Sequence, residues 1–330
     1  MTLNTDRFGV AILDDYEGVA DQVAAYRKLK QHAEVKVLRE RLATDDDFRR
    51  ALEGVHAVLL MRERTWFGEK QLSLVPSLKL ISQTGRTTVH LDMPGLTKRG
   101  VAVAVTPGDS GNSTVELTVA LILALLRRIP EVDRRMREEP WPAVAGQVFE
   151  GKTLGVIGLG RIGAKVARIA QLFQARVIAT GRTLTAERAR EAGAEAVSLE
   201  KLLRESDIVA IHCPLNAQTR GMIGEKEFAL MKPGALLVNT ARGPIVSQSA
   251  LLDALKTGRL GGAGLDVYDE EPLPMDHPLR RLNNTVLLSH RGYATVEILR
   301  ERYEAAMENI LAFVDGKAVN VINPEALPHK

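Results

Sequence analysis

A glycine-rich loop near the middle of the chain constrains the fold more than any other feature. Gly158, Gly160 and Gly163 form a Gly-x-Gly-x-x-Gly motif directly after the apolar segment Thr153–Ile157. In such a motif the first glycine permits a tight turn, the second lets the backbone approach a pyrophosphate, and the third lets the next helix pack closely on the sheet. The start of that helix offers N–H groups and a partial positive charge to phosphate. Because a further strand is expected at Arg176–Thr180, the motif predicts a complete β-α-β dinucleotide-binding unit.

The rest of the chain alternates short apolar runs with amphipathic ones, which predicts parallel sheets covered by helices. The expected strands are Phe8–Leu13, Val35–Leu38, Ala57–Met61, Leu78–Ser82, Val101–Val105, Thr153–Ile157, Arg176–Thr180, Ala194–Val197, Asp207–His212, Ala235–Thr240, Gly261–Val267 and Thr285–Ser289. The expected helices are Val19–Leu29, Asp45–Leu52, Ile162–Phe173, Ser249–Thr257 and Val296–Val314. Since the last helix follows the second series of strands, we expect the end of the chain to return to the first domain.

A strongly apolar segment separates the two series of strands. Ser113 opens a Ser-Thr-Val-Glu capping-box pattern, which predicts a helix from there to Pro130. Because the segment is apolar nearly all round, we expect it to be buried between domains or at a subunit contact. A charged stretch, 131–139, follows it.

Composition narrows the class of protein. A chain of 330 residues suggests about two domains. The 44 lysines and arginines exceed the 41 acidic residues by only three. So small an excess of positive charge does not indicate binding to nucleic acid or to an anionic membrane. The longest apolar run, 117–126, covers about half a bilayer, and the first twenty residues show no secretory signal. A single cysteine, Cys213, excludes an internal disulfide and a Cys-rich metal site. We expect a cytoplasmic protein without a metal.

The end of the second strand in the β-α-β unit bears on the choice of cofactor. NAD sites usually carry Asp or Glu there, whose carboxylate binds the ribose 2′-hydroxyl. This chain reads Thr180-Gly181-Arg182-Thr183. It lacks the carboxylate that would repel a 2′-phosphate and has an arginine that can pair with one. The pattern favours NADP(H) over NAD(H); the alternative is that Arg182 is a solvated surface residue and NAD binds through its other contacts.

Three polar residues each follow the carboxyl end of an expected strand, where open α/β sheets hold their ligands. They are Arg242, Glu271 and His290. Hydride transfer at a carbon that bears oxygen needs such a set. Histidine exchanges the proton of the oxygen, a carboxylate holds the imidazole tautomer, and arginine clamps a substrate carboxylate.

Taken singly, each of these residues has another explanation. Glu271 also fits an exposed turn acid, and Arg242 fits a surface residue beside a glycine. His212 stands in a place similar to that of His290, directly after an expected strand. The prediction therefore depends on the combination.

The chain resembles the D-isomer-specific 2-hydroxyacid dehydrogenase family over almost its whole length. The segments that carry the resemblance are Gly-Lys-Thr-Leu-Gly-Val-Ile-Gly-Leu-Gly-Arg-Ile-Gly (151–163), His-Cys-Pro-Leu-Asn-Ala-Gln-Thr-Arg-Gly (212–221), Met-Lys-Pro-Gly-Ala-Leu-Leu-Val-Asn-Thr-Ala-Arg-Gly (231–243), Gly-Ala-Gly-Leu-Asp-Val-Tyr (262–268) and Glu-Pro-Leu (271–273). The resemblance implies an α/β fold of two Rossmann-like or flavodoxin-like domains with parallel sheets. A NAD(P)-binding domain, 113–290, would be inserted into a substrate domain, 1–112 and 291–330. It also implies a homodimer, joined partly through the helix expected at 113–129.

The resemblance assigns the catalytic roles to Arg242, Glu271 and His290. It suggests that Asp266 contacts the nicotinamide amide and that Pro214 and Thr219 lie along the adenosine. The expected cofactor-binding residues are Gly158, Gly160, Arg161, Ile162, Gly163, Gly181, Arg182, Thr183, Cys213, Pro214, Thr219, Thr240, Ala241, Asp266 and Gly292. The expected substrate-binding residues are Arg62, Gly85, Arg86 and Thr87.

Two segments depart from the family pattern. Ser289 and Arg291 flank the histidine, where the family usually has a proline and a small or apolar residue. The substrate loop reads Gly85-Arg86-Thr87-Thr88 in place of a Gly-x-Gly turn whose N–H groups hold the substrate carboxylate. Loss of the second glycine changes the turn, and Arg86 adds a positive charge.

A pair of arginines follows the third expected strand. Arg62 and Arg64 resemble the anion-binding Arg-x-Arg-Thr of D-3-phosphoglycerate dehydrogenases. Two solvated arginines at a strand end explain the pattern equally well.

The leading hypothesis is an NAD(P)-dependent oxidoreductase that moves hydride between nicotinamide and C2 of a small 2-hydroxy or 2-oxo acid. Glyoxylate, hydroxypyruvate and 3-phosphoglycerate-like acids are candidates. The alternative is a nucleotide-sensing, corepressor-like binding protein on the same fold, because the three polar residues do not exclude it. A nucleotide-dependent hydrolase or a formate-type dehydrogenase fits less well, since formate-type sites pair the histidine with a glutamine.

Overall fold

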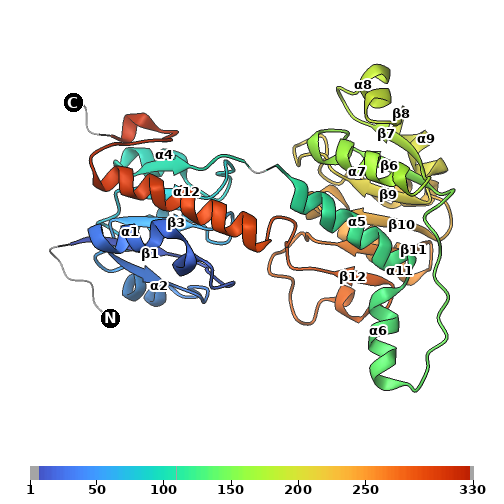
Figure 1. Ribbon diagram of the computed structural model, residues 1–330, viewed down its shortest axis with the longest axis horizontal. Coiled ribbons are helices and arrows are strands. Elements are labelled where there is room, and N and C mark those ends of the chain that lie inside the picture. The colour runs from blue at the N-terminus through green and yellow to red at the C-terminus, as the bar shows by residue number, and fades with distance from the viewer. Residues whose placement is uncertain (1–6, 109, 328–330) are drawn as a thin grey trace. The chain divides into compact units, whose positions relative to one another are not determined.

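The computed structural model describes residues 7–108 and 110–327 (Figure 1). The chain divides into two compact units, one formed by Met1–Ser110 with Ala294–Lys330 and the other by Gly111–Tyr293. Both are α/β units with parallel sheets. The second unit is thus inserted into the first in sequence, as the fold class predicted.

The first unit is built on a parallel sheet in the order β2-β1-β3-β4-β5. Its strands are β1 (Phe8–Ile12), β2 (Ala33–Val37), β3 (Ala57–Leu60), β4 (Leu80–Gln83) and β5 (Ala102–Val105). Its helices are α1 (Ala24–His32), α2 (Asp45–Leu52), α3 (Glu69–Leu74), α4 (Met93–Lys98) and α12 (Val296–Val314). Every residue of β3, β4 and β5 is buried, as expected for parallel strands covered on both faces.

The C-terminal helix belongs to this first unit, as the sequence predicted. Helix α12 packs against α1 and β4, and Ser82 of β4 donates a hydrogen bond from Oγ to the Ala306 carbonyl at 2.8 Å. After the helix, Val321 bridges to Ala104 of β5. The segment after α12 therefore rejoins the sheet of the first unit.

The second unit has the order β12-β11-β10-β9-β6-β7-β8, and all its strand pairs are parallel. The strands are β6 (Thr153–Ile157), β7 (Arg176–Thr180), β8 (Glu195–Ala196), β9 (Ile208–Ile211), β10 (Ala235–Asn239), β11 (Leu260–Leu265) and β12 (Thr285–Leu287). The helices are α5 (Asn112–Leu126), α6 (Ile129–Glu138), α7 (Arg161–Leu172), α8 (Ala186–Glu191), α9 (Leu199–Glu205), α10 (Glu225–Leu230) and α11 (Gln248–Lys256). The strand order reverses between β6 and β9, which is where doubly wound sheets bind their ligands.

The capping-box prediction at Ser113 is wrong. Helix α5 begins at Asn112 after Gly111, which is left-handed with φ 72°, so Ser113 lies inside the first turn, where it is buried, and not at the N-cap. Helix α5 packs against α7, β10 and β11 of its own unit. Contacts within the second unit therefore already account for the burial of α5.

Helix α5 also ends earlier than predicted. It stops at Leu126, and Arg128 adopts a left-handed conformation with φ 51°. Pro130 lies in the first turn of α6, where its missing N–H costs nothing. The charged stretch is thus a helix, and i,i+4 ion pairs such as Arg135–Glu139 at 2.8 Å stabilise it.

Shorter segments also differ from the sequence reading. The helix expected at Val19–Leu29 is interrupted at Val23, which is extended, and a 3-10 turn at Ala20–Gln22 precedes α1. Helices α3, α4, α8, α9 and α10 were not predicted, because six or seven residues are too few to show a helical period. In the part of the chain that the structure describes, no helix is long and apolar enough to cross a membrane.

Candidate active site

The glycine-rich loop joins β6 to α7. Gly158 has φ 98°, and a Cβ there would lie 2.7 Å from the Cys213 backbone nitrogen. A Cβ on Gly163 would lie 2.3 Å from the Gly158 carbonyl oxygen. At Gly160 a Cβ would meet nothing within 4 Å, and this glycine begins α7 without a side-chain cap. Packing requires the two outer glycines, whereas the middle one faces open space at a helix N-terminus, which fits a pyrophosphate.

The end of β7 lies beside the turn that follows β9. Arg182 is exposed, and its Nη1 donates a hydrogen bond to Gln218 Oε1 at 3.2 Å. The Thr219 hydroxyl donates to the Pro214 carbonyl at 2.7 Å and accepts from the Asn216 N–H at 2.8 Å. Thr219 therefore shapes the turn, and Arg182 is an exposed charged group beside it.

A histidine–glutamate pair lies at the other end of the strand order. His290 Nδ1 and Glu271 Oε2 are 2.7 Å apart. The other oxygen of Glu271, Oε1, accepts the Tyr268 N–H at 2.9 Å. The two side chains are 27% and 34% exposed, so a ligand can reach them. With Nδ1 held by a carboxylate, Nε2 is the ring nitrogen that can exchange a proton.

Asp266 holds the turn that carries the histidine. Its carboxylate is buried and accepts the Arg291 N–H at 2.5 Å and the Gly292 N–H at 2.8 Å, and its carbonyl accepts the His290 N–H at 2.8 Å. Burial raises the pKa of Asp266, which these backbone donors partly offset. The resemblance predicts a contact with the nicotinamide amide; in the structure this carboxylate positions the turn at His290, whose φ is 55°.

Arg242 is half-buried on the loop after β10, and its Nη1 donates to the Ala241 carbonyl at 2.7 Å. Asn239 ties this loop together, because its amide accepts the Ala241 N–H and donates to the Arg242 carbonyl, both at 3.0 Å. A Cβ on Gly243 would lie 2.0 Å from the carbonyl carbon of Tyr268. Only glycine therefore lets the Arg242 loop lie against the loop that leads to Glu271.

Two threonines of α5, which the sequence analysis missed, join these loops. Thr114 donates from Oγ1 to the Gly292 carbonyl at 2.9 Å. The Thr118 hydroxyl lies 3.0 Å from that of Thr240, which was predicted to bind cofactor. Threonines four residues apart in an otherwise apolar helix were the available signal, since a buried hydroxyl needs a partner.

His212, the competing histidine, is unsuited to proton transfer near neutral pH. Its ring is buried, which lowers its pKa to about 4. Within the described ranges, its Nε2 is buried without a hydrogen-bond partner. His212 therefore remains a neutral imidazole, whereas His290 is paired with a carboxylate.

Other predicted cofactor residues lie on the same edge of this sheet. Thr183 accepts a hydrogen bond from Arg188 through its carbonyl at 3.1 Å. Burial raises the pKa of the half-buried Cys213 thiol.

Among the residues with described positions, no group of His, Cys, Asp and Glu could hold a metal ion.

The predicted substrate residues lie in the first unit. Gly85 has φ 82°, and its N–H donates to Thr106 Oγ1 at 2.7 Å. Arg62 also has a positive φ, 55°, and its Nε lies 3.3 Å from Glu63 Oε2. Arg86 is exposed, and Thr87 is half-buried. Because Thr106 takes the Gly85 N–H, this loop does not hold a carboxylate through that N–H.

The reading of Arg62 and Arg64 as two solvated arginines is wrong. Their side chains are only 18% and 13% exposed. Arg64 makes a bidentate pair with Glu17, at 2.7 and 3.0 Å, and its guanidinium carbon lies 4.7 Å from the centre of the Tyr16 ring. Arg64 is thus neutralised inside the unit, which separates it from Arg62.

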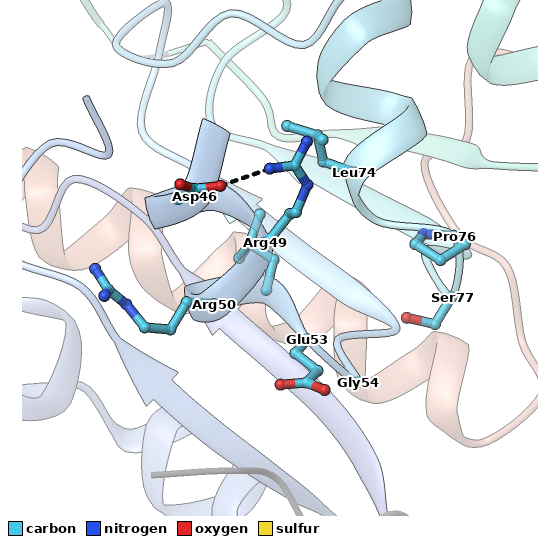
Figure 2. A pocket seen from close by; sticks show the side chains of 9 residues that line it. Asp46, Arg49, Arg50, Glu53, Gly54, Leu74, Pro76 and Ser77 are labelled. Atoms are coloured by element: carbon cyan, nitrogen blue, oxygen red, sulfur yellow. Dashed lines mark hydrogen bonds and ion pairs between the residues drawn. The ribbon is translucent and has the colours of Figure 1, made fainter. Parts of the chain in front are cut away.

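A cavity of about 460 Å³ lies between α2 and α3 in the first unit (Figure 2). Charged side chains line it and pair with their neighbours, as Arg49 does with Asp46 at 2.6 Å. None of the predicted site residues lines it. This cavity is not the active site.

The fold and the site together define a class: a doubly wound parallel sheet with a dinucleotide loop and a paired His–Glu set is typical of nicotinamide-dependent dehydrogenases. Residues 119–292 match the family model described as D-isomer specific 2-hydroxyacid dehydrogenase, NAD binding domain. The chain belongs to the D-isomer-specific 2-hydroxyacid dehydrogenase family. It is an oxidoreductase that uses a nicotinamide cofactor and acts on a small hydroxy or oxo acid, as the sequence predicted.

Relatives carry two kinds of name. The chain is 43% identical to a glyoxylate reductase from Aeropyrum pernix over 266 residues, 78% of this chain and 79% of the relative. It is 35% identical to a D-3-phosphoglycerate dehydrogenase from Archaeoglobus fulgidus over 271 residues, 81% of this chain and 51% of the relative. The fold is similar to that of a phosphoglycerate oxidoreductase from Vibrio cholerae, with a TM-score of 0.88, 32% identity and coverage of 94% and 99% of the two chains.

Proposed function

We propose that the protein reduces a 2-oxo acid to the 2-hydroxy acid, with His290 as the general acid and Arg242 as the clamp for the substrate carboxylate. The 2.7 Å contact between His290 Nδ1 and Glu271 Oε2 carries this proposal. Glu271 orients the ring so that Nε2 delivers a proton to the C2 oxygen as that oxygen gains charge. The nicotinamide, when bound, supplies the hydride. In the oxidative direction His290 takes the proton back.

Arg242 acts on the same substrate through its guanidinium. A planar fork of donors matches a carboxylate and polarises the carbonyl next to it. The Gly243 contact, which brings this loop against the one leading to Glu271, supports a shared site for the three residues. On this proposal the second unit binds the cofactor and supplies Arg242, Glu271 and His290.

Loss of NADPH or NADH absorbance on a panel of 2-oxo acids tests the function. We expect the protein to reduce at least one of these acids with a kcat of roughly 1–10³ s⁻¹, the range typical of enzymes. A complete absence of turnover with both cofactors would contradict the proposal and favour the nucleotide-sensing alternative.

We further propose a preference for NADP(H). Arg182 is the exposed cation at the end of β7, and Gln218 holds its guanidinium. Because a charge-assisted hydrogen bond is worth about 1.5–3 kcal/mol, Arg182→Ala is expected to raise KM for NADPH about 10- to 100-fold and to leave KM for NADH unchanged. Arg190→Ala, which changes an exposed arginine of α8, is the control. Equal effects on both cofactors would contradict the preference.

A homodimer is the proposed assembly. The segment from α6 onward exposes large apolar side chains, including Ile129 at 53% and Trp141 at 84%. Exposed apolar surface of this kind is typical of a protein interface. Sedimentation equilibrium measures the mass; a monomer at micromolar concentration would contradict the assembly.

A further inference from the structure

Tyr268 contacts both halves of the histidine–glutamate pair. Its main-chain N–H donates to Glu271 Oε1 at 2.9 Å. Its phenol hydroxyl lies 2.7 Å from the Leu288 carbonyl oxygen and 3.1 Å from that of Leu265, and can donate to either. Leu288 follows β12 and stands two residues before His290. Tyr268 therefore holds the glutamate through its backbone and the histidine segment through its side chain.

The hydroxyl completes the sheet where β11 and β12 end. The Leu288 N–H donates to the Leu265 carbonyl at 2.8 Å, which continues the pairing of the two strands by one residue. Within the described residues, no backbone N–H donates to the Leu288 carbonyl, and the Tyr268 hydroxyl takes that place. The side chain thus ties the two strands together at the point where the chain turns toward His290.

The surroundings of the phenol keep it a donor. Tyr268 is 7% exposed, and a buried hydroxyl needs a hydrogen-bond partner. Burial raises the pKa of Tyr268, and the negative charge of Asp266 raises it further. The phenol therefore keeps its proton at neutral pH and donates it to a carbonyl. Its loss would leave the Leu288 carbonyl without this donor while the aromatic ring still packs.

The histidine segment is held from two sides. Asp266 accepts the N–H groups of His290, Arg291 and Gly292, whereas the Tyr268 hydroxyl holds the chain before the histidine. His290 has φ 55°, a conformation that residues other than glycine rarely adopt. Such a conformation persists only where surrounding contacts impose it. The position of the imidazole therefore depends on both sets of contacts.

We propose that the Tyr268 hydroxyl positions His290 against Glu271 and so sets the direction in which Nε2 presents its proton to the substrate. This inference rests on the proposed function, in which His290 is the general acid. Tyr268 is a positioning residue, because it acts through the histidine and no proton passes through it. A general acid must lie within hydrogen-bond reach of the oxygen that it protonates, so a small displacement of the ring lowers kcat.

The kinetic test is Tyr268→Phe, which removes the hydroxyl and keeps the ring. We expect kcat to fall about 10- to 100-fold, whereas KM for the acid and Kd for NADPH should stay within about threefold of wild type. The matched control is Thr285→Val, at the opposite end of β12, where the Thr285 hydroxyl donates to the Leu282 carbonyl at 3.0 Å. Both variants lose one hydroxyl–carbonyl bond, so their melting temperatures should fall by similar amounts. Only Tyr268→Phe should lose kcat.

Proton NMR examines the pair without turnover. A proton held between His290 Nδ1 and Glu271 Oε2 gives a resonance far downfield, which His290→Gln removes and thereby assigns. In Tyr268→Phe we expect this resonance to broaden, because a less firmly held ring exchanges its proton with water more readily. In Thr285→Val it should be unchanged. Tyr268→p-aminophenylalanine restores a donor at the end of the ring, and it should restore both the resonance and kcat to within about threefold of wild type.

Wild-type kcat in Tyr268→Phe, or an equal loss of kcat in Thr285→Val, would overturn the proposal. If Tyr268→Phe does not fold, Tyr268→p-aminophenylalanine carries the test, and loss of the resonance in that variant would overturn it. If the wild-type protein reduces no acid but the resonance broadens in Tyr268→Phe alone, the proposed function fails and the positioning role stands. If the wild type reduces an acid and Tyr268→Phe keeps both kcat and the resonance, only the role of Tyr268 fails.

Discussion

Replacing His290 with glutamine is expected to lower kcat by about 10²- to 10⁴-fold, the range that a positioned acid or base contributes. Glutamine keeps an amide that Glu271 can contact but cannot deliver a proton to the C2 oxygen. Cofactor affinity should be unchanged, because His290 follows β12 whereas the glycine loop follows β6. Steady-state kinetics and fluorescence titration with NADPH measure the two quantities.

The control for this variant is His32→Gln, at the exposed last residue of α1. It should keep wild-type kcat. Turnover of His290→Gln near that of the wild type would remove the residue from the mechanism. A parallel loss of NADPH affinity would instead indicate that the substitution disturbs the turn held by Asp266.

Arg242→Ala is expected to lower kcat/KM by about 10³-fold, divided between a higher KM and a lower kcat. Its guanidinium would contact the substrate carboxylate in the ground state and the C2 oxygen as charge develops, and each charge-assisted bond is worth about 1.5–3 kcal/mol. Arg242→Lys should recover part of the activity, because it restores the charge and not the fork.

The matched control is Arg281→Ala, an exposed arginine of the same unit, which should leave both constants unchanged. Added guanidinium ion should restore part of the turnover of Arg242→Ala, since it replaces the missing group in the cavity that the variant leaves. An Arg242→Ala enzyme that loses only cofactor affinity would show that the residue binds the cofactor and not the acid.

Some residues of the site can be predicted from the sequence more readily than others, and their contacts in the structure explain why. At Gly158 and Gly163 a Cβ would lie less than 3 Å from neighbouring backbone atoms. Such positions are visible in the sequence because they exclude every residue type except glycine. Thr114 and Thr118 leave a weaker mark, since threonine is also tolerated in helices for other reasons.

The sequence by itself determined the α/β class, most strand positions, the dinucleotide loop and the family, because these depend on local periodicity and on glycines at fixed spacing. Only the tertiary structure decided that α5 begins at Asn112, that Glu17 neutralises Arg64, and that Asp266 holds the turn that carries His290. Each of these depends on backbone dihedrals or on contacts between segments far apart in the chain. Hydrophobic patterning does not encode such partners; they are selected only when the strands and helices pack.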